Sequence, residues 1–216
     1  MDILVAGGHG QVALRLLAIL AEAGHTARGL IRKPDQAADL QAVGAVPVIG
    51  DLENDQTLSP YVKGADAVVF AAGAGPGSGP ARKRTVDLGG AVKLADAAVE
   101  QGVRRYVMIS SIGAQDPAAG GDTMGPYLAA KAEADAYVTS LASLDWTIVR
   151  PGHLVDEPGT GLVTVSRQLG GSGPVPRDDV AAVVAACLTT PATVGVTFEL
   201  FGGSTPIDEA LRHAGV

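Results

Sequence analysis

The chain has 216 residues, of which 47% are hydrophobic and 18% are charged, and its formal net charge at pH 7 is -7. This length suits a single domain with a substantial core, and the low charge content excludes a disordered chain. The acidic balance gives no indication of a nucleic-acid partner, because binding to a phosphate backbone requires a basic face.

The cysteine and histidine residues indicate the redox compartment of the protein and whether it has a metal site. Cys187 is the only cysteine, so an intramolecular disulfide is excluded and nothing indicates an oxidising compartment. It lies in an apolar run, which favours a buried structural thiol over a reactive one. The histidines are scattered without the spacing of metal ligands, so we expect no metal site. They are His9, His25, His153 and His213.

Targeting and membrane segments are also not expected. The sequence begins with an apolar run that we interpret as a strand, without a basic segment before it. No apolar run approaches the length of a membrane span. We therefore expect a cytoplasmic protein that does not associate with a membrane.

The first predicted strand ends in glycines and is followed at once by a helix over residues 12–23. Gly7 and Gly10 let the backbone turn sharply and approach a pyrophosphate, while Ala13 lets the helix lie close to the strand. The start of such a helix offers free N–H groups and a partial positive charge. This context favours a nucleotide, although glycines also occur in strand-to-helix turns for geometry alone.

The second predicted strand, residues 25–31, ends in Arg32 and Lys33, where an NAD-binding unit usually has an acidic residue for the ribose hydroxyls. A basic pair suits the 2′-phosphate of NADP instead. Arg32 is the better candidate, because its planar guanidinium can bind phosphate and stack on adenine. The alternative is a pair of solvated loop charges.

The next predicted elements are a short helix over residues 35–43 and a third strand over residues 45–49. That strand ends in Gly50, Asp51 and Leu52. Asp51 either meets the adenine edge or caps the next helical segment, and the sequence leaves both open.

A short helical segment over residues 58–62 precedes a fourth strand that ends in Ala71, Ala72 and Gly73. Parallel sheets bind ligands beyond the carboxyl ends of their strands, so these small residues are expected beneath the cofactor. Residues 74–80, rich in glycine and proline, form either a mobile lid or a simple exposed loop.

A long helix over residues 85–101 leads to a fifth strand, residues 103–109, which runs directly into Ser110 and Ser111. A helix over residues 124–144 and a sixth strand over residues 145–149 follow. Strand and helix thus alternate six times, which predicts an α/β fold with a Rossmann-type, doubly wound parallel sheet.

The remaining sequence is less regular, with an apolar run at 162–165, a helix at 177–188, a strand at 196–201 and a short helix after Pro206. We expect residues 1–216 to form one NAD(P)-binding domain in which residues 152–216 contribute a small substrate-side cap.

Tyr127 and Lys131 are four residues apart on the predicted helix and share one face, so the ammonium can lie near the phenol hydroxyl. A neighbouring positive charge favours a phenolate, which suits Tyr127 for proton transfer to or from a substrate oxygen. Ser111 or Ser110 would hold that oxygen by a hydrogen bond. Lys131 can alternatively donate to the nicotinamide ribose, and both side chains can be ordinary helix-surface residues.

The sequence resembles the atypical short-chain dehydrogenase/reductases over nearly its whole length. Within them it is most similar to a compact NAD(P)H-binding branch that includes flavin and biliverdin reductases and relatives of NmrA-like sensors. The motifs that carry the resemblance are Gly7-x-x-Gly10-x-x-Ala13, Gly50-Asp51, Ala71-Ala72-Gly73, Ser110-Ser111, Tyr127-x-x-x-Lys131, Trp146-Thr147-Ile148-Val149-Arg150-Pro151-Gly152 and Asp179-Val180-Ala181.

The resemblance implies a site for an NAD(P) cofactor. Its adenosine end is implied at Gly7, His9, Gly10, Gln11, Val12, Arg32, Lys33, Asp51 and Leu52, and its nicotinamide end at Ala72, Gly73, Ser110, Lys131, Pro151, Gly152 and His153. The glycine turn departs from many relatives, because His9 and Gln11 stand where those often have threonine and a basic residue. Arg32 and Lys33 are therefore the main support for NADP over NAD.

The leading hypothesis is an NADP-dependent oxidoreductase acting on a small carbonyl, alcohol, quinone or flavin-like substrate. The position that matches Tyr127 varies in the branch, and some members bind the cofactor without a recognised reaction. A non-catalytic NADP(H) sensor that acts through a protein partner is therefore the second hypothesis. A sugar epimerase or dehydratase is the third, because the short C-terminal part leaves little room for a nucleotide-sugar.

Overall fold

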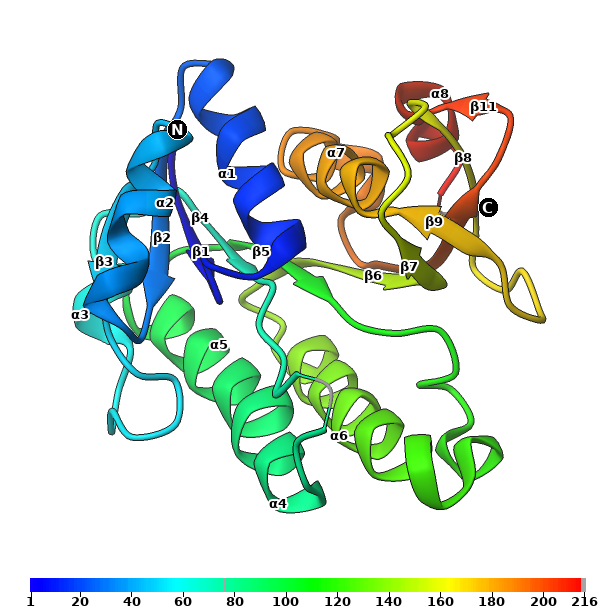
Figure 1. Cartoon of the computed structure of the whole chain (residues 1–216), viewed down its shortest axis with the longest axis horizontal. Helices are drawn as coiled ribbons and strands as arrows, with labels where there is room; N and C mark the ends of the chain where they lie inside the picture. Colours follow the sequence, from blue (N-terminus) through cyan, green and yellow to red (C-terminus); the bar gives the residue numbers. More distant parts are fainter. Residues whose placement is uncertain (76, 215–216) are drawn as a thin grey trace.

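The computed structural model describes residues 1–75 and 77–214 and is built around one mostly parallel sheet (Figure 1). In the described chain this sheet has the strand order β11-β8-β10-β6-β5-β4-β1-β2-β3. Its strands are β1 (Asp2–Ala6), β2 (Thr26–Ile31), β3 (Val46–Ile49), β4 (Ala67–Phe70), β5 (Arg105–Ile109), β6 (Asp145–Pro151), β8 (Leu162–Ser166), β10 (Val196–Gly202) and β11 (Thr205–Pro206). A separate small sheet pairs β7 (His153–Val155) with β9 (Pro174–Pro176).

The helices connect these strands. They are α1 (Gln11–Glu22), α2 (Ala37–Ala42), α3 (Ser59–Val62), α4 (Pro80–Arg82), α5 (Ala91–Glu100), α6 (Gly121–Ser140), α7 (Arg177–Cys187) and α8 (Ile207–Arg212). Shorter 3-10 turns lie at Pro34–Gln36, Pro117–Gly120 and Pro191–Thr193, and a π-helical segment spans Lys83–Gly90.

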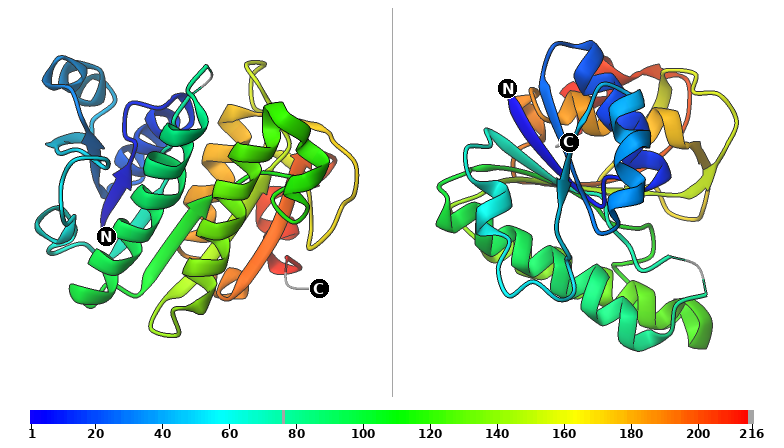
Figure 2. Two further views of the ribbon diagram at one scale, coloured as in Figure 1. Left: turned by 90° about the horizontal axis from the view of Figure 1, so that it is seen from below. Right: turned by 60° about the vertical axis from the view of Figure 1, so that its left-hand side comes forward.

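Helices cover both faces of the sheet, as Figures 1 and 2 show. Alternate side chains of a strand point to opposite faces, so the central strands bury both sets. Ile3 and Val5 of β1 pack with α1 and α7, whereas Leu4 packs in the cluster that includes α5 and α6. The near-continuous apolar sequences of β1 and β4 therefore result from burial on both faces.

The predicted fold class is confirmed: the order β3-β2-β1-β4-β5-β6 is that of a doubly wound Rossmann sheet. The part beyond residue 152, expected as a cap, has two roles. The β7 and β9 pair and α8 are small additions, whereas β10 pairs parallel to β6 and continues the main sheet. β8 and β11 then complete that edge as antiparallel strands. The sequence marked an apolar run at 162–165 and a strand at 196–201, but a local pattern does not say with which strand each of them pairs.

Two helix boundaries differ from the prediction. The helix expected over residues 85–101 begins at Pro80 and includes the π-helical segment before α5. The helix expected over residues 124–144 begins at Gly121 and ends at Ser140, because Leu141 already has an extended backbone. Of the predicted lid or loop at 74–80, Pro76 lies outside the described residues. No helix in the described part of the chain is both long and apolar enough to cross a membrane.

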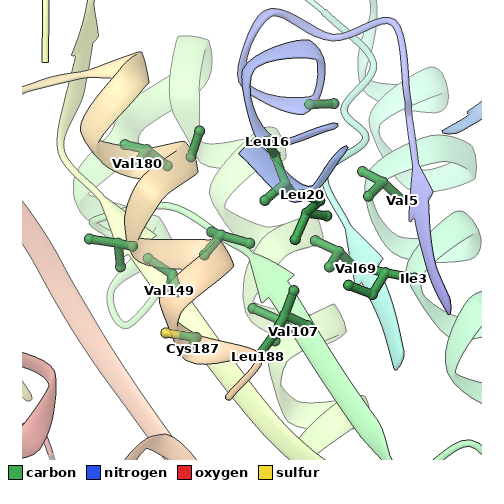
Figure 3. Packing of buried hydrophobic residues seen from close by; sticks show 14 of the residues in the cluster. Ile3, Val5, Leu16, Leu20, Val69, Val107, Val149, Val180, Cys187 and Leu188 are labelled. Carbon is green, nitrogen blue, oxygen red and sulfur yellow. The ribbon is translucent and has the colours of Figure 1, made fainter. Parts of the chain in front are cut away.

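Cys187, the last residue of α7, is fully buried in the core (Figure 3), where burial raises the pKa of its thiol to about 12. The thiolate is the reactive form, so a buried neutral thiol should be inert. We expect no labelling of the folded protein by a thiol reagent at pH 8 within minutes, and complete labelling in denaturant. Rapid labelling under native conditions would contradict this packing.

Candidate functional site

The strand order reverses between β1 and β4, and an open cleft of about 270 Å³ lies beyond the carboxyl ends of these strands. Ligands of doubly wound sheets bind at this switch point. The described residues that line the cleft are Gly7, His9, Gly10, Leu30, Ile31, Arg32, Gln36, Gly50, Asp51, Leu52, Glu53, Ala71, Ala72, Gly73, Arg82 and Val86.

The glycine turn passes directly over the neighbouring strand ends. Gly7 has a φ of +83°, and a Cβ there would lie 2.7 Å from Cα of Ala72. A Cβ on Gly8 would lie 2.8 Å from Cα of Gly29 in β2. Both contacts are with backbone, which cannot move aside as a side chain does. Gly8 is not recognisable as essential from local sequence, because only its long-range contact with β2 explains the glycine.

The turn leads into an uncapped helix. Gly10 is the N-cap of α1, the described first turn of this helix contains no acidic residue, and no side chain caps it. The N–H groups of Gln11 and Val12 have no partner within the helix, because the first turn of any α-helix leaves its donors free. Bare donors, a positive helix end and a close-packed glycine turn fit the phosphates of a dinucleotide.

His9 forms the wall between this turn and α2. Its Nε2 donates to Oδ2 of Asp39 at 2.7 Å, and its Nδ1 accepts from Nε2 of Gln36 at 3.1 Å. The imidazole is thus held by two side chains from one segment. His9 therefore contributes to the cleft as a fixed wall as well as through its backbone.

Arg32 and Lys33 have different positions. Arg32 lines the cleft, and its Nη1 lies 3.3 Å from Oε2 of Glu53. Lys33 is exposed and does not belong to the described lining of the cleft. The basic pair predicted from sequence is therefore divided, and Arg32 alone faces the cleft.

Asp51 caps the turn that follows β3 and also lines the cleft. Its Oδ1 accepts the N–H of Glu53 at 2.8 Å, and its Oδ2 accepts Nδ2 of Asn54 at 2.9 Å. Burial alone would raise the pKa of this carboxyl, but these hydrogen bonds and Arg32 lower it overall. Asp51 is therefore a carboxylate at neutral pH, with much of its acceptor capacity used within the turn.

At the other end of the sheet edge, Lys131 is 3% exposed and forms a buried ion pair with Asp87. Its Nζ lies 3.4 Å from Oδ1 of Asp87 and donates to the carbonyl oxygens of Ile109 at 3.1 Å and of Ala72 at 3.5 Å. Oδ2 of Asp87 also accepts the N–H of Ala74 at 3.0 Å. The ammonium thus lies where β4 and β5 end.

Two ammonium groups lie near the ring of Tyr127. Nζ of Lys83 is 5.1 Å from the centre of its ring, and Nζ of Lys131 is 5.8 Å from it. Its hydroxyl makes no hydrogen bond with the described residues, so it is free to meet a substrate. The Lys131 ammonium thus lies near the ring of Tyr127, whereas its ion-pair partner is Asp87.

The two serines after β5 differ. Ser111 is half-buried and donates from Oγ to the carbonyl oxygen of Ile112 at 3.0 Å. Ser110 is buried, and its Oγ lacks a well-formed hydrogen bond among the described residues. It nevertheless lies near enough to the Asp135 carboxyl to favour the charged form of that group. Ser111 is thus the more accessible of the two.

Asp135, which sequence analysis missed, lies one helical turn beyond Lys131. Nε and Nη2 of Arg150 lie 2.9 and 2.8 Å from its Oδ2. Burial raises the pKa of this carboxyl, outweighing Ser110, Arg150 and Lys131, which favour the carboxylate. The spacing Tyr127, Lys131, Asp135 was visible in the sequence, but the burial of an acidic residue was not.

The segment Pro151 to His153 marks the end of β6. Pro151 is buried, and a Cβ on Gly152 would overlap the carbonyl oxygen of Gly173 and the ring of Phe201. His153 is exposed and begins β7. None of the three belongs to the described lining of the adenosine-side cleft, so the predicted cofactor residues fall into two groups along the sheet edge. In residues 1–75 and 77–214, no three His, Cys, Asp or Glu side chains gather as a metal site.

A family model described as NAD(P)H-binding matches residues 7–191. The chain belongs to the NAD(P)H-binding family. This confirms the resemblance inferred from the motifs and agrees with the Rossmann-type sheet. A nicotinamide cofactor therefore accounts for the glycine turn, the uncapped helix and the cleft.

Similar proteins cover the whole chain. A Bacillus subtilis protein named uncharacterized sugar epimerase YhfK is 37% identical, over 98% of this chain and 99% of its own length. A solved Bacillus halodurans structure, named provisionally as an NAD-dependent epimerase/dehydratase, is 41% identical with a TM-score of 0.92, covering 98% of both chains. The oxidoreductase ylbE from Lactococcus lactis is 30% identical with a TM-score of 0.84, covering 98% of this chain and 95% of its own.

Gly8→Ala tests the contact between the turn and β2. The added methyl group would overlap backbone atoms, so we expect a loss of about 1–3 kcal/mol in the free energy of unfolding. Gly79→Ala is the control, because Gly79 has open space around its Cβ position and a negative φ. Urea denaturation measures both, and equal stability of the two variants would refute the close approach.

Asp135→Asn tests the buried carboxyl through pH. Because the folded state holds the proton more tightly than the unfolded state, the contribution of Asp135 is fully present below its unfolded pKa of about 4 and declines as pH rises through the folded pKa. The free energy of unfolding of the wild type minus that of the variant should therefore fall as the pH rises above about 4. Urea denaturation at several pH values measures it, with exposed Glu157→Gln as the control. A difference that rises with pH would contradict the raised pKa.

Proposed function

We propose that this protein is an NADP(H)-dependent oxidoreductase that acts on a small carbonyl, alcohol, quinone or flavin-like substrate. The observation that carries the proposal is the buried ion pair of Lys131 and Asp87, which lies beside Tyr127 at the sheet edge that also bears the cleft. A buried lysine held by a carboxylate and two strand-end carbonyl groups is a costly arrangement for a helix-surface residue. It suits a fixed charge in a site.

The proposed adenosine half of the site is the cleft itself, with Arg32 facing the 2′-phosphate and the N-terminus of α1 facing the pyrophosphate. The proposed nicotinamide half lies toward Lys131. The residues that we propose to hold the cofactor are Gly7, His9, Gly10, Gln11, Val12, Arg32, Asp51, Leu52, Ala72, Gly73, Lys131, Pro151, Gly152 and His153. Lys33 is a weaker candidate, because it is exposed outside the cleft.

The proposed chemistry assigns a task to each side chain near the reactive end. Bound NADPH supplies a hydride to the acceptor. The Tyr127 hydroxyl gives its proton to the acceptor oxygen that becomes negative, so a carbonyl is reduced to an alcohol and a phenolate remains. Lys83 and Lys131, whose ammonium groups both lie near the ring, stabilise that phenolate, and solvent returns its proton. Ser111 turns its hydroxyl from Ile112 to donate a hydrogen bond to the acceptor.

A sensor function is the second candidate, and one observation favours it. Lys131 directs its ammonium to Asp87 and to carbonyl groups, as a lysine with a purely structural role would. In that case the cleft would bind NADP(H), and a protein partner would recognise the form with the cofactor bound.

We also propose a cytoplasmic location for the protein.

Tyr127→Phe separates these candidates. NADPH consumption is followed with aldehydes, quinones and flavins, and we expect turnover of carbonyl substrates to fall about 10²–10⁴-fold while NADPH affinity is retained. Tyr137→Phe is the matched control, because it removes a hydroxyl from the same helix. That hydroxyl donates a hydrogen bond to Asp96 and is not part of the proposed site. Unchanged turnover in Tyr127→Phe would exclude the tyrosine acid. Tight NADPH binding with no turnover on any acceptor would favour the sensor.

A further inference from the structure

Glu53 joins two arginines across the rim of the adenosine-side cleft. Its Oε2 lies 3.3 Å from Nη1 of Arg32, at the end of β2, and 3.1 Å from Nη2 of Arg82, at the end of α4. Its Oε1 accepts the hydroxyl of Thr85 at 2.8 Å. Segments that are 21 and 29 residues from Glu53 in sequence thus meet at one carboxylate.

Hydrogen bonds of the Glu53 backbone also fix the position of this residue. The N–H of Glu53 donates to Asp51 at 2.8 Å, and the carbonyl oxygen of Glu53 accepts Nζ of Lys93 at 3.1 Å. The Glu53 side chain is only 21% exposed. Burial alone would raise the pKa of this carboxyl, but Thr85, Arg82 and Arg32 lower it overall, so it is charged at neutral pH.

Arg82 makes more hydrogen bonds to the protein than Arg32 does. Arg82 directs Nε and Nη2 to Glu53 and Nη1 to the carbonyl oxygen of Ala74, so each nitrogen of its guanidinium donates to the protein. Arg32 uses only Nη1 on Glu53 and is 47% exposed. Arg32 is therefore the group of this cluster that can turn toward a bound anion, and Glu53 is the anion that already holds it.

We propose that Glu53 is an internal competitor of the 2′-phosphate for Arg32, and that it thereby sets the preference of the cleft between NADP(H) and NAD(H). The proposal rests on the proposed function, because it requires a dinucleotide in this cleft. A 2′-phosphate has to draw Arg32 away from Glu53 and to tolerate a fixed carboxylate nearby. A cofactor with a free 2′-hydroxyl has neither of these two disadvantages. Glu53 therefore reduces the preference of the wild-type protein for NADP(H) over NAD(H).

The size of the effect follows from ordinary electrostatics. Glu53 weakens a bound 2′-phosphate mainly through Arg32, because a guanidinium divided between two anions binds each of them less strongly than one that serves a single anion. The direct repulsion between Glu53 and the phosphate is the smaller part, because solvent screens it in the open cleft. Removal of the Glu53 charge should therefore tighten binding of a 2′-phosphate roughly tenfold or more, without comparable effect on a ligand that lacks it.

Glu53→Gln tests the proposal through calorimetric titration with 2′,5′-ADP and with 5′-AMP, two ligands that carry no nicotinamide. We expect about tenfold tighter binding of 2′,5′-ADP and a change of less than about twofold for 5′-AMP. Glu133→Gln is the matched control, because it removes another glutamate bound to an arginine, Arg84, away from the cleft lining. Glu53→Asp keeps the charge but shortens the side chain, so its gain should lie between those of wild type and Glu53→Gln.

The same titration in an Arg32→Ala background completes a double-mutant cycle. If Glu53 acts through Arg32, most of the gain from Glu53→Gln disappears there. Equal tightening of both ligands, a gain that persists without Arg32, or weaker binding of 2′,5′-ADP to folded Glu53→Gln and Glu53→Asp would each overturn the proposal. The absence of binding in wild type and both variants would also overturn it. A lack of NADPH turnover with the expected fragment affinities would instead count against the proposed oxidoreductase alone.

Discussion

The buried contact of Asp87 with Lys131 is the interaction on which the site depends. It joins the π-helical segment before α5 to α6, and Asp87 also holds the loop after β4 through the N–H of Ala74. A π-helical segment widens the helix by one residue per turn and often occurs at functional sites. Loss of either charged partner leaves the other buried alone, which costs about 3–5 kcal/mol. Stability and site geometry therefore rest on the same pair.

A layer of buried polar groups continues from this pair along the sheet edge. Asp135 and Arg150 are bound to each other beside Lys131, and Glu199 on β10 lies in register with Arg150. Oε1 of Glu199 accepts Nε2 of Gln115 at 2.9 Å, and its Oε2 accepts the N–H of Leu169 at 2.6 Å. Glu199 thus fixes two loops that flank the proposed nicotinamide end. Irregular loops of this kind need internal partners, because their backbone groups lack a sheet or helix to bind.

Much of the fold was predictable because its signals are local. The glycines after β1, the alternation of buried strands with helices and the basic Arg32 can each be recognised within a few residues. The added strands β8, β10 and β11 were not recognised as part of the sheet, since pairing with β6 is set by tertiary packing. For the site, sequence proposed Gly7, Gly10 and Arg32, and the cleft contains all three.

The sequence by itself determined the family, the parallel sheet and the position of the glycine turn, because periodicity and turn chemistry act over short stretches of chain. Only the tertiary structure decided which charges meet. Lys131 was expected near Tyr127 or at the nicotinamide ribose, and the fold adds Asp87 as the ion-pair partner of its ammonium. Glu53 carried no motif, yet folding places it between Arg32 and Arg82. Such pairings depend on how crossover helices return to the sheet, and no local pattern of residues encodes that geometry.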